Sequence, residues 1–288
     1  MFWDTPEIRS LVRSALQEDS VQSDLTTKLL IKSAWVVEAT IVAKQKGIIA
    51  GLPLAAGFFN AVDRGILFKP AVREGALVLP RQTLALIKGR ASSILSAERP
   101  ALNALQHLSG IATYTHHQVQ KLMGTPVKLY DTRKTLPGWR ALQKYAVRCG
   151  GGFNHRMSLG DEIMIKENHL KVARLSKSDW IKNVQHVMGM RKAPTVQMEI
   201  QTERDLQDAL RLAPPRVLLD NLPPKVLKRM IRRLRRAIPG IEIEITGGVK
   251  PETLRSLARL GPDRISMGRL THSVTNFDCS LNITRVYS

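Results

Sequence analysis

The sequence predicts a mixed α/β protein, with strands and a long helix in its first part and a parallel sheet in its second. After Gly124, apolar runs of strand length alternate with helical patterns, and such alternation predicts a parallel sheet, open or closed into a barrel. Before Gly124 the strands come first and a long helix follows, which is typical of an α+β layer. At 288 residues the chain fits one large domain or two of moderate size.

The first part supplies the elements of the α+β layer. Apolar residues recur on one face of Pro6–Glu18 at helical spacing, so we expect a helix there. Strands are expected at residues 36–42, 48–51, 67–72 and 83–88. A mostly helical stretch follows over residues 92–123, weakened at Gly110 because glycine is a poor helix former.

The second part supplies the alternating elements. Strands are expected at residues 127–130, 163–166, 196–200, 217–219, 241–245 and 265–267. Helices are expected between them at residues 137–149, 179–190, 203–212, 224–238 and 251–260. Pro137, Pro224 and Pro251 stand where three of these helices would begin, the position at which proline is tolerated best.

Polar or glycine residues stand at or just after the carboxyl end of each of the six strands predicted in the second part. Asp131, Thr132 and Arg133 follow the first strand, Lys166 ends the second and Glu199 lies near the end of the third. Asp220 follows the fourth strand, Thr246 with Gly247 and Gly248 the fifth, and Gly268 the sixth. The carboxyl ends of parallel strands converge on one face of a barrel, so we expect these residues to share a site. One such residue alone would mean little, because helix N-caps also follow strands.

Five cationic or potentially cationic side chains stand among glycines between Asp131 and His169. They are Arg133, Lys134, His155, Arg156 and Lys166. A pocket that concentrates positive charge without matching carboxylates favours an anionic ligand. For any one of these residues taken alone, an exposed turn is the simpler interpretation.

Two carboxylates and a glycine pair add to the hypothesis of a pocket for an anionic ligand. Glu199 and Asp220 fit a Mg²⁺ site completed by substrate oxygens and water, although a salt bridge or helix cap explains the pair equally well. Thr246, Gly247 and Gly248 are expected to precede a helix at Pro251, whose N-terminal amides would bind phosphate.

Composition narrows the class of protein. The net charge is +20, which favours anionic partners. The two cysteines form no disulfide framework, and the longest apolar run, residues 47–59, is short of the roughly 20 residues that span a bilayer. We therefore expect a cytoplasmic protein. No metalloprotease, P-loop, nucleophile-elbow or dinucleotide-binding motif is present.

Residues 225–236 contain seven cations and no acid. This pattern indicates an outer helix with a solvated basic face, and nucleic-acid or anionic-membrane binding is the alternative.

The motifs DTRKTLPGWRALQKYAV, GGGFNHR and IKENH, in this order and spacing, resemble the quinolinate phosphoribosyltransferase family. The resemblance extends through SAERPALNALQHLSGIAT, VLLDN, ITGGV and ISMGRLTHS, and it covers nearly the whole chain. It implies an incomplete parallel α/β barrel of fewer than eight strands over residues 113–272. It also implies an N-terminal α/β sandwich over residues 1–112, joined by residues 273–288. The implied reaction converts quinolinate and phosphoribosyl pyrophosphate to nicotinate mononucleotide, CO₂ and pyrophosphate in NAD biosynthesis, with Mg²⁺ and no organic cofactor.

The resemblance also implies residue roles. Quinolinate and pyrophosphate would be bound by Thr132, Arg133, Lys134, His155, Arg156 and Lys166. Glu199 and Asp220 would hold the ribose hydroxyls and Mg²⁺, directly or through water, and Thr246, Gly247, Gly248 and Gly268 would take the 5′-phosphate. The residues implied to be catalytic are Lys134, Lys166, Glu199 and Asp220.

The implied assembly is a homodimer in which Arg99 enters the neighbour's site, with room for a larger oligomer and with no membrane or specific nucleic-acid partner. The chain departs from the family pattern at Thr246, usually serine, at Pro100, usually threonine, and at Arg269, usually small. A sister phosphoribosyltransferase with another aromatic acid as substrate is the alternative function.

Overall fold

The computed structural model describes residues 2–288, which fall into two compact units. The first unit runs to His116 and also contains residues 136–151 and 273–288. The second contains residues 117–135 and 152–272. The domain limits expected from the sequence, at residues 112 and 273, stay a prediction.

The first unit is built around an antiparallel sheet. Its helices are η1 (Phe2–Asp4), α1 (Pro6–Glu18), η2 (Val21–Ser23), α2 (Leu25–Leu30), α3 (Leu52–Val62), most of α4 (Ala91–Lys121) and α5 (Arg140–Cys149). Its strands are β1 (Val36–Ala43), β2 (Gly47–Ile48), β3 (Leu67–Pro70), β4 (Leu77–Val78), β5 (Thr83–Arg90) and β12 (Cys279–Tyr287). The main sheet has the order β12-β1-β5-β3, and β2 pairs with β4 separately.

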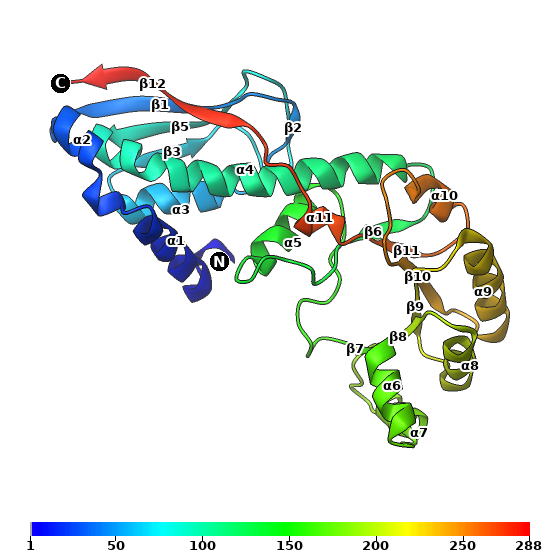
Figure 1. Cartoon of the computed structure of the whole chain (residues 1–288). Helices are drawn as coiled ribbons and strands as arrows, with labels where there is room; N and C mark the ends of the chain where they lie inside the picture. The colour runs from blue at the N-terminus through cyan, green and yellow to red at the C-terminus, as the bar shows by residue number, and fades with distance from the viewer. Residues whose placement is uncertain (1) are drawn as a thin grey trace. The chain divides into compact units, whose positions relative to one another are not determined.

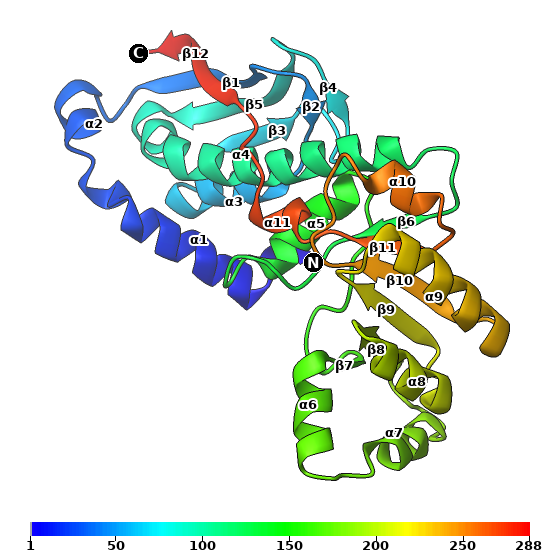
Figure 2. The same ribbon diagram turned by 45° about the vertical axis from the view of Figure 1, so that its right-hand side comes forward.

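One face of this sheet is covered by helices, as expected for an α/β sandwich. Figures 1 and 2 both show α3 and α4 along the same face of the sheet. Alternate residues of β1 are buried, from Val37 to Ala43. This period-two pattern places one face of the strand in the core. The expected helix at Pro6–Glu18 is confirmed, with the Thr5 side chain accepting a hydrogen bond from the Ile8 N–H as the N-cap.

Helix α4 continues through two residues that ordinarily weaken helices, Pro100 and Gly110. A Cβ on Gly110 would collide with the backbone of Thr275 and Asn276, which lead into β12. The glycine is therefore needed for the close approach of the C-terminal segment, and it does not end the helix. Strand β12 itself, which pairs with β1, was not expected from the sequence.

The second unit contains the parallel sheet. Its strands are β6 (Lys128–Tyr130), β7 (Ile163–Ile165), β8 (Val196–Ile200), β9 (Arg216–Asp220), β10 (Glu242–Thr246) and β11 (Arg264–Ser266). Its helices are α6 (Glu167–Leu175), α7 (Trp180–Met188), α8 (Glu203–Leu212), α9 (Pro224–Ala237), α10 (Leu254–Ala258) and α11 (Arg269–His272).

The strand order β6-β11-β10-β9-β8-β7 gives the sheet its barrel character. All five pairings are parallel. Each strand lies beside its neighbour in the sequence except β6 and β7, which occupy the two edges. This is the order of a barrel opened between its first and second strands, and it confirms the expected incomplete barrel. An isolated parallel bridge between Tyr130 and Phe153 extends the β6 edge toward the opening.

Several boundaries differ from those expected. Pro224 opens α9 as predicted, whereas α5 and α10 begin three residues after Pro137 and Pro251, at Arg140 and Leu254. The expected helix start at Pro251 was wrong because residues 251–253 form a turn before α10. Among residues 2–288, no helix combines the length and hydropathy needed to cross a membrane.

Candidate active site

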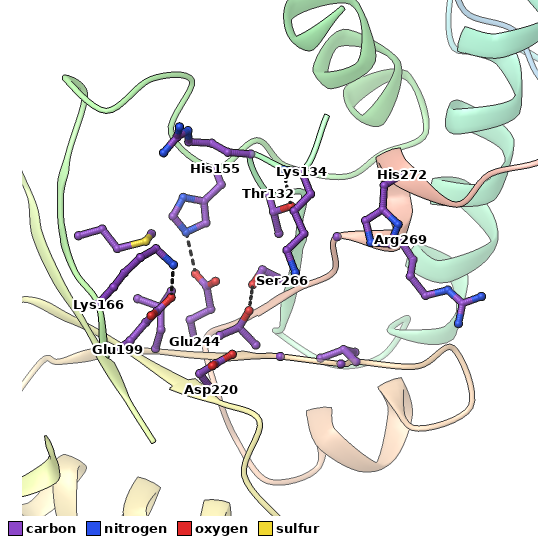
Figure 3. A pocket seen from close by; sticks show the side chains of 18 of the residues that line it. Thr132, Lys134, His155, Lys166, Glu199, Asp220, Glu244, Ser266, Arg269 and His272 are labelled. Atoms are coloured by element: carbon purple, nitrogen blue, oxygen red, sulfur yellow. Dashed lines mark hydrogen bonds and ion pairs between the residues drawn. The ribbon is translucent and has the colours of Figure 1, made fainter. Parts of the chain in front are cut away.

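A pocket of about 700 Å³ lies at the carboxyl ends of the parallel strands of the second unit. Figure 3 shows side chains from successive strand ends directed toward it. It brings together twelve of the thirteen residues expected to bind substrate: Thr132, Arg133, Lys134, His155, Arg156, Lys166, Glu199, Asp220, Thr246, Gly247, Gly248 and Gly268. Six Lys and Arg side chains line it against three carboxylates, so the pocket has a positive balance.

The buried Asp131 joins the two loops that carry most of this charge. One carboxylate oxygen accepts a hydrogen bond from the His155 N–H at 2.8 Å, and the other accepts one from the Asn154 Nδ2 at 2.6 Å. Asp131 comes directly after β6 and is fully buried. The loop after β6 and the 152–156 loop are therefore fixed to each other, although Asp131 and Asn154 are 23 positions apart in the sequence.

Arg133 and Arg156 bring two guanidinium groups to the same part of the pocket. Burial, and after it the charge of Arg133, lowers the pKa of Arg156. Arg156 donates to the Glu162 carbonyl at 2.8 Å and to the Met164 sulfur at 3.6 Å. Among residues 2–288, the buried Nε of each arginine has no hydrogen-bond partner. Adjacent guanidinium groups with unsatisfied donors are suited to binding a carboxylate or phosphate.

Lys166 and Glu199 form an ion pair across neighbouring strands (Figure 3). Lys166 caps α6 directly after β7, and Glu199 is the fourth residue of β8. The lysine is 44% exposed and the glutamate 11%, so the pair has one side open to the pocket. Helix α6 was not expected from the sequence; Lys166 was placed there at the end of a strand.

Asp220 and the Thr246 loop form the next part of the wall. Asp220 ends β9 and accepts a hydrogen bond from the Gln201 Nε2 at 2.7 Å, while the Ser266 hydroxyl donates to that of Thr246 at 2.8 Å. Gly247 has φ +81°, and a Cβ there would collide with the Asp220 carboxylate and the Asn221 N–H. The loop therefore requires glycine at this position. The expectation that this loop forms a helix N-terminus was wrong, because α10 begins only at Leu254.

Lys134 and Gly268 meet at the side of the pocket formed by β6 and β11. The Thr132 hydroxyl accepts a hydrogen bond from the Lys134 N–H at 3.1 Å, and Thr271 donates to the Lys134 carbonyl at 2.7 Å. A Cβ on Gly268 would lie 3.1 Å from the Lys134 side chain. The lysine backbone is thus held from both sides, and the glycine leaves room for its side chain.

Sequence reasoning missed several lining residues, of which Glu244 is the most notable. It is fully buried, points into the pocket from β10, and lies 3.4 Å from the His155 Nε2 (Figure 3). The alternation of Glu242, Glu244 and Thr246 with isoleucines was the available signal, since it places all three on one face of the strand. The other residues not assigned to the site are Met164, Leu218, Val249, Lys250, Arg269 and His272.

Arg99 is the expected site residue that does not line this pocket. It lies on α4 in the first unit, where its side chain is exposed. The neighbouring Glu98 is partly buried, and this burial raises its pKa. The role of Arg99 stays a prediction.

The carboxylates of the pocket fit a partial metal site only. Among residues 2–288, no group of three or more His, Cys, Asp or Glu side chains could hold a metal ion. Glu199 and Asp220 supply hard oxygen ligands of the kind Mg²⁺ takes, and a Mg²⁺ ion here would need further oxygens from a bound substrate. The donor set therefore suits an ion that enters with a phosphorylated ligand.

An α/β barrel whose strand ends combine paired arginines, two carboxylates and a glycine-rich loop defines an enzyme for phosphorylated and acidic substrates. The profile of the quinolinate phosphoribosyl transferase N-terminal domain matches residues 24–109, and that of the C-terminal domain matches residues 111–282. The chain belongs to the quinolinate phosphoribosyltransferase family, whose members are transferases of NAD biosynthesis.

Individual relatives agree over nearly the full length. The chain is 36% identical to a probable nicotinate-nucleotide pyrophosphorylase [carboxylating] of Bacillus subtilis, over 96% of this chain and 94% of that protein. It is also 36% identical to the nicotinate-nucleotide pyrophosphorylase [carboxylating] of Mycobacterium leprae, over 96% of each. The structure of the nicotinate-nucleotide pyrophosphorylase from Francisella tularensis superposes with a TM-score of 0.88 at 32% identity, covering 99% of both chains.

Proposed function

We propose that this chain transfers the phosphoribosyl group of phosphoribosyl pyrophosphate to the ring nitrogen of quinolinate. The products are nicotinate mononucleotide, pyrophosphate and CO₂. The observation that carries the proposal is the pair of arginines, Arg133 and Arg156, whose buried Nε groups lack partners among residues 2–288. Quinolinate carries two adjacent carboxylates, and two neighbouring guanidinium groups match such a dianion.

The pocket also carries the groups that the second substrate requires. Lys134 and Lys166 add point charges for the pyrophosphate, while Thr246, Gly247, Gly248 and Gly268 take the 5′-phosphate. Glu199 and Asp220 hold the ribose hydroxyls. Dense fixed charge is needed because both substrates are polyanions that repel each other in water.

The chemical steps need position and electrostatics more than a reactive side chain. The ring nitrogen of quinolinate forms a bond to ribose C1 while the bond from C1 to pyrophosphate breaks, through an oxocarbenium-like state. The positive ring nitrogen then stabilises the electron pair left on C2 when the 2-carboxylate departs as CO₂, and C2 takes up a proton. The protein forms no covalent intermediate in this scheme and contributes by orientation.

Mg²⁺ enters in this proposal as the partner of phosphoribosyl pyrophosphate, and it supplies charge neutralisation for the leaving pyrophosphate. Glu199 and Asp220 hold it, directly or through water, together with substrate oxygens. The two carboxylates therefore serve the ribose side of the pocket, whereas the arginines serve the pyridine side.

The proposed assembly is a homodimer in which Arg99 of one copy completes the anion site of the other. The exposure of Arg99 on α4 supports a role outside its own subunit's fold. The two cysteines are free thiols, which supports the cytoplasm as the compartment. The comparisons give no support to the alternative functions, a sister enzyme for another acid or a nucleic-acid-binding protein.

Turnover with quinolinate, phosphoribosyl pyrophosphate and Mg²⁺ tests the proposal. Purified, folded protein should release nicotinate mononucleotide, pyrophosphate and CO₂ in equal amounts, measured by chromatography and by ¹⁴CO₂ from labelled quinolinate. Arg133→Ala should lower kcat/KM at least about tenfold, which corresponds to about 1.4 kcal/mol of transition-state stabilisation. Arg255→Ala, which removes an exposed arginine of α10 that does not line the pocket, should leave it unchanged. If the folded protein forms no product from these substrates, the proposal is wrong.

A further inference from the structure

Glu244 stands out among the acidic residues of the barrel because it is buried without full pairing. Its side chain is fully buried, and among residues 2–288 neither carboxylate oxygen has a hydrogen-bond partner. Glu242, two residues earlier on the same face of β10, is paired with Arg264 and with Arg216 at 2.8 Å. A buried carboxyl group that lacks such partners is costly to desolvate, so its presence needs a reason.

Binding of the proposed substrates does not explain why a buried carboxyl group stands at position 244. Glu244 lines a pocket that the proposed function assigns to two polyanions, and a carboxyl group in this position offers them no attraction. Glu244 instead contacts the imidazole of His155, whose Nε2 lies 3.4 Å from the Glu244 Oε2 (Figure 3). The contact between these two side chains is itself almost fully buried, at 5% and 0% exposure.

The other ring nitrogen of His155 determines what Glu244 faces. The His155 Nδ1 accepts a hydrogen bond from the Arg156 N–H at 3.0 Å. An acceptor nitrogen must keep its lone pair, so the ring hydrogen resides on Nε2, the nitrogen that lies 3.4 Å from the Glu244 Oε2. The carboxylate therefore selects the tautomer that allows the imidazole to accept from the Arg156 backbone.

This contact extends from Glu244 to the anion site. Arg156 is the residue after His155, and it lines the same pocket as Arg133, whose charge acts on its guanidinium. The His155 backbone is fixed independently by Asp131 at 2.8 Å. With the ring held by Glu244 and the backbone held by Asp131, the orientation of the Arg156 main chain has little freedom left.

We propose that Glu244 is a positioning residue for the pyridine-dicarboxylate side of the site. It fixes the tautomer and orientation of His155, and through His155 the placement of Arg156. The inference rests on the proposed function and adds a residue to it. It predicts an effect on the affinity for quinolinate and little effect on that for phosphoribosyl pyrophosphate.

Two substitutions separate the acceptor role of Glu244 from its volume. Glu244→Gln keeps an oxygen that can accept from the His155 Nε2–H, whereas Glu244→Leu keeps the bulk and removes the acceptor. We expect the leucine variant to raise the KM for quinolinate about tenfold and to leave the KM for phosphoribosyl pyrophosphate within about twofold. We expect the glutamine variant to restore most of the difference. Glu242→Gln is the matched control, since it removes a carboxylate from the same face of β10 outside the pocket.

A spectroscopic measurement tests the inference without turnover. In protein labelled with ¹⁵N-histidine and assigned with His155→Gln, the ¹⁵N shifts of His155 should report the Nε2–H tautomer in the native protein, in Glu244→Gln and in Glu242→Gln. Glu244→Leu should show a mixture with the Nδ1–H form. Unchanged His155 shifts together with unchanged quinolinate KM in Glu244→Leu overturn the inference. If the native protein forms no nicotinate mononucleotide, the proposed function fails, while the tautomer measurement still decides the contact between Glu244 and His155.

Discussion

Substitution of Gly247 by alanine should separate backbone strain from damage to the site. Gly247 has φ +81°, and a Cβ there would press on the Asp220 Oδ1 and on the Asn221 backbone. Gly261 is its matched control, because it has φ +82° and a Cβ there would have no heavy atom within 4 Å. Alanine at either position meets the left-handed backbone, which costs about 1–2 kcal/mol and lowers Tm by a few degrees.

The two variants should differ in activity. The Asn221 backbone cannot move aside as a flexible side chain would, so Gly247→Ala must displace the end of β9 together with the Asp220 carboxylate. Displacing a substrate-positioning group by about 1 Å lowers the rate about 100-fold, whereas we expect Gly261→Ala to keep kcat/KM within about twofold. Steady-state kinetics with varied phosphoribosyl pyrophosphate, beside thermal denaturation of both variants, measures this. Equal kcat/KM values for the two folded variants would refute the reasoning.

Three further predictions concern assembly, pH and surface charge. If Arg99 completes the neighbour's site, mixing the impaired Arg99→Ala and Arg133→Ala proteins in equal amounts should restore roughly a quarter of native activity, because half of the dimers are hybrids and one of the two sites in each hybrid is intact. No recovery after verified subunit exchange would contradict it. Burial raises the pKa of the Cys149 thiol to about 11 and that of Cys279 to about 12. The stability from these groups is therefore present below about pH 9 and lost as pH rises toward 11–12, because the unfolded thiols release their protons first; urea unfolding across this range should show a slope that Cys→Ala variants reduce. Lys225→Gln on the basic face of α9 should leave kcat/KM unchanged, and a tenfold loss would place that face in the catalytic machinery.

The second unit was more predictable than the first because its strands are short, apolar and separated by well-marked helices. β8 and α8 were expected at the residues where they occur, since β8 is buried on both faces and Thr202 caps α8 with Asp205. The β2 strand was expected at residues 48–51, but the sheet takes only Gly47–Ile48 and α3 begins at Leu52. An apolar run of this kind has no clear period, so burial alone could not separate strand from helix.

The residues of the candidate site could be predicted from the sequence for a different reason. Strand-end positions could be located in the sequence, and the parallel topology brought them to one pocket. Glu244 was missed because it precedes the strand end by two residues and belongs to the interior of the barrel. Its contact with His155 depends on the fold of two distant segments, which no local pattern in the sequence reports.

The chain passes between the two compact units four times, after residues 116, 135, 151 and 272. One of these excursions separates Thr132 and Arg133 from His155 and Arg156, so the two anion-binding loops are interrupted by a helix that belongs to the other unit. No single cut therefore yields either unit as a continuous polypeptide. In recombination between relatives, a crossover near residue 110 would exchange the sandwich but leave α5 behind with the barrel of the other parent. Chimaeras should tolerate such a crossover only when residues 136–151 and 273–288 are exchanged together with the N-terminal segment.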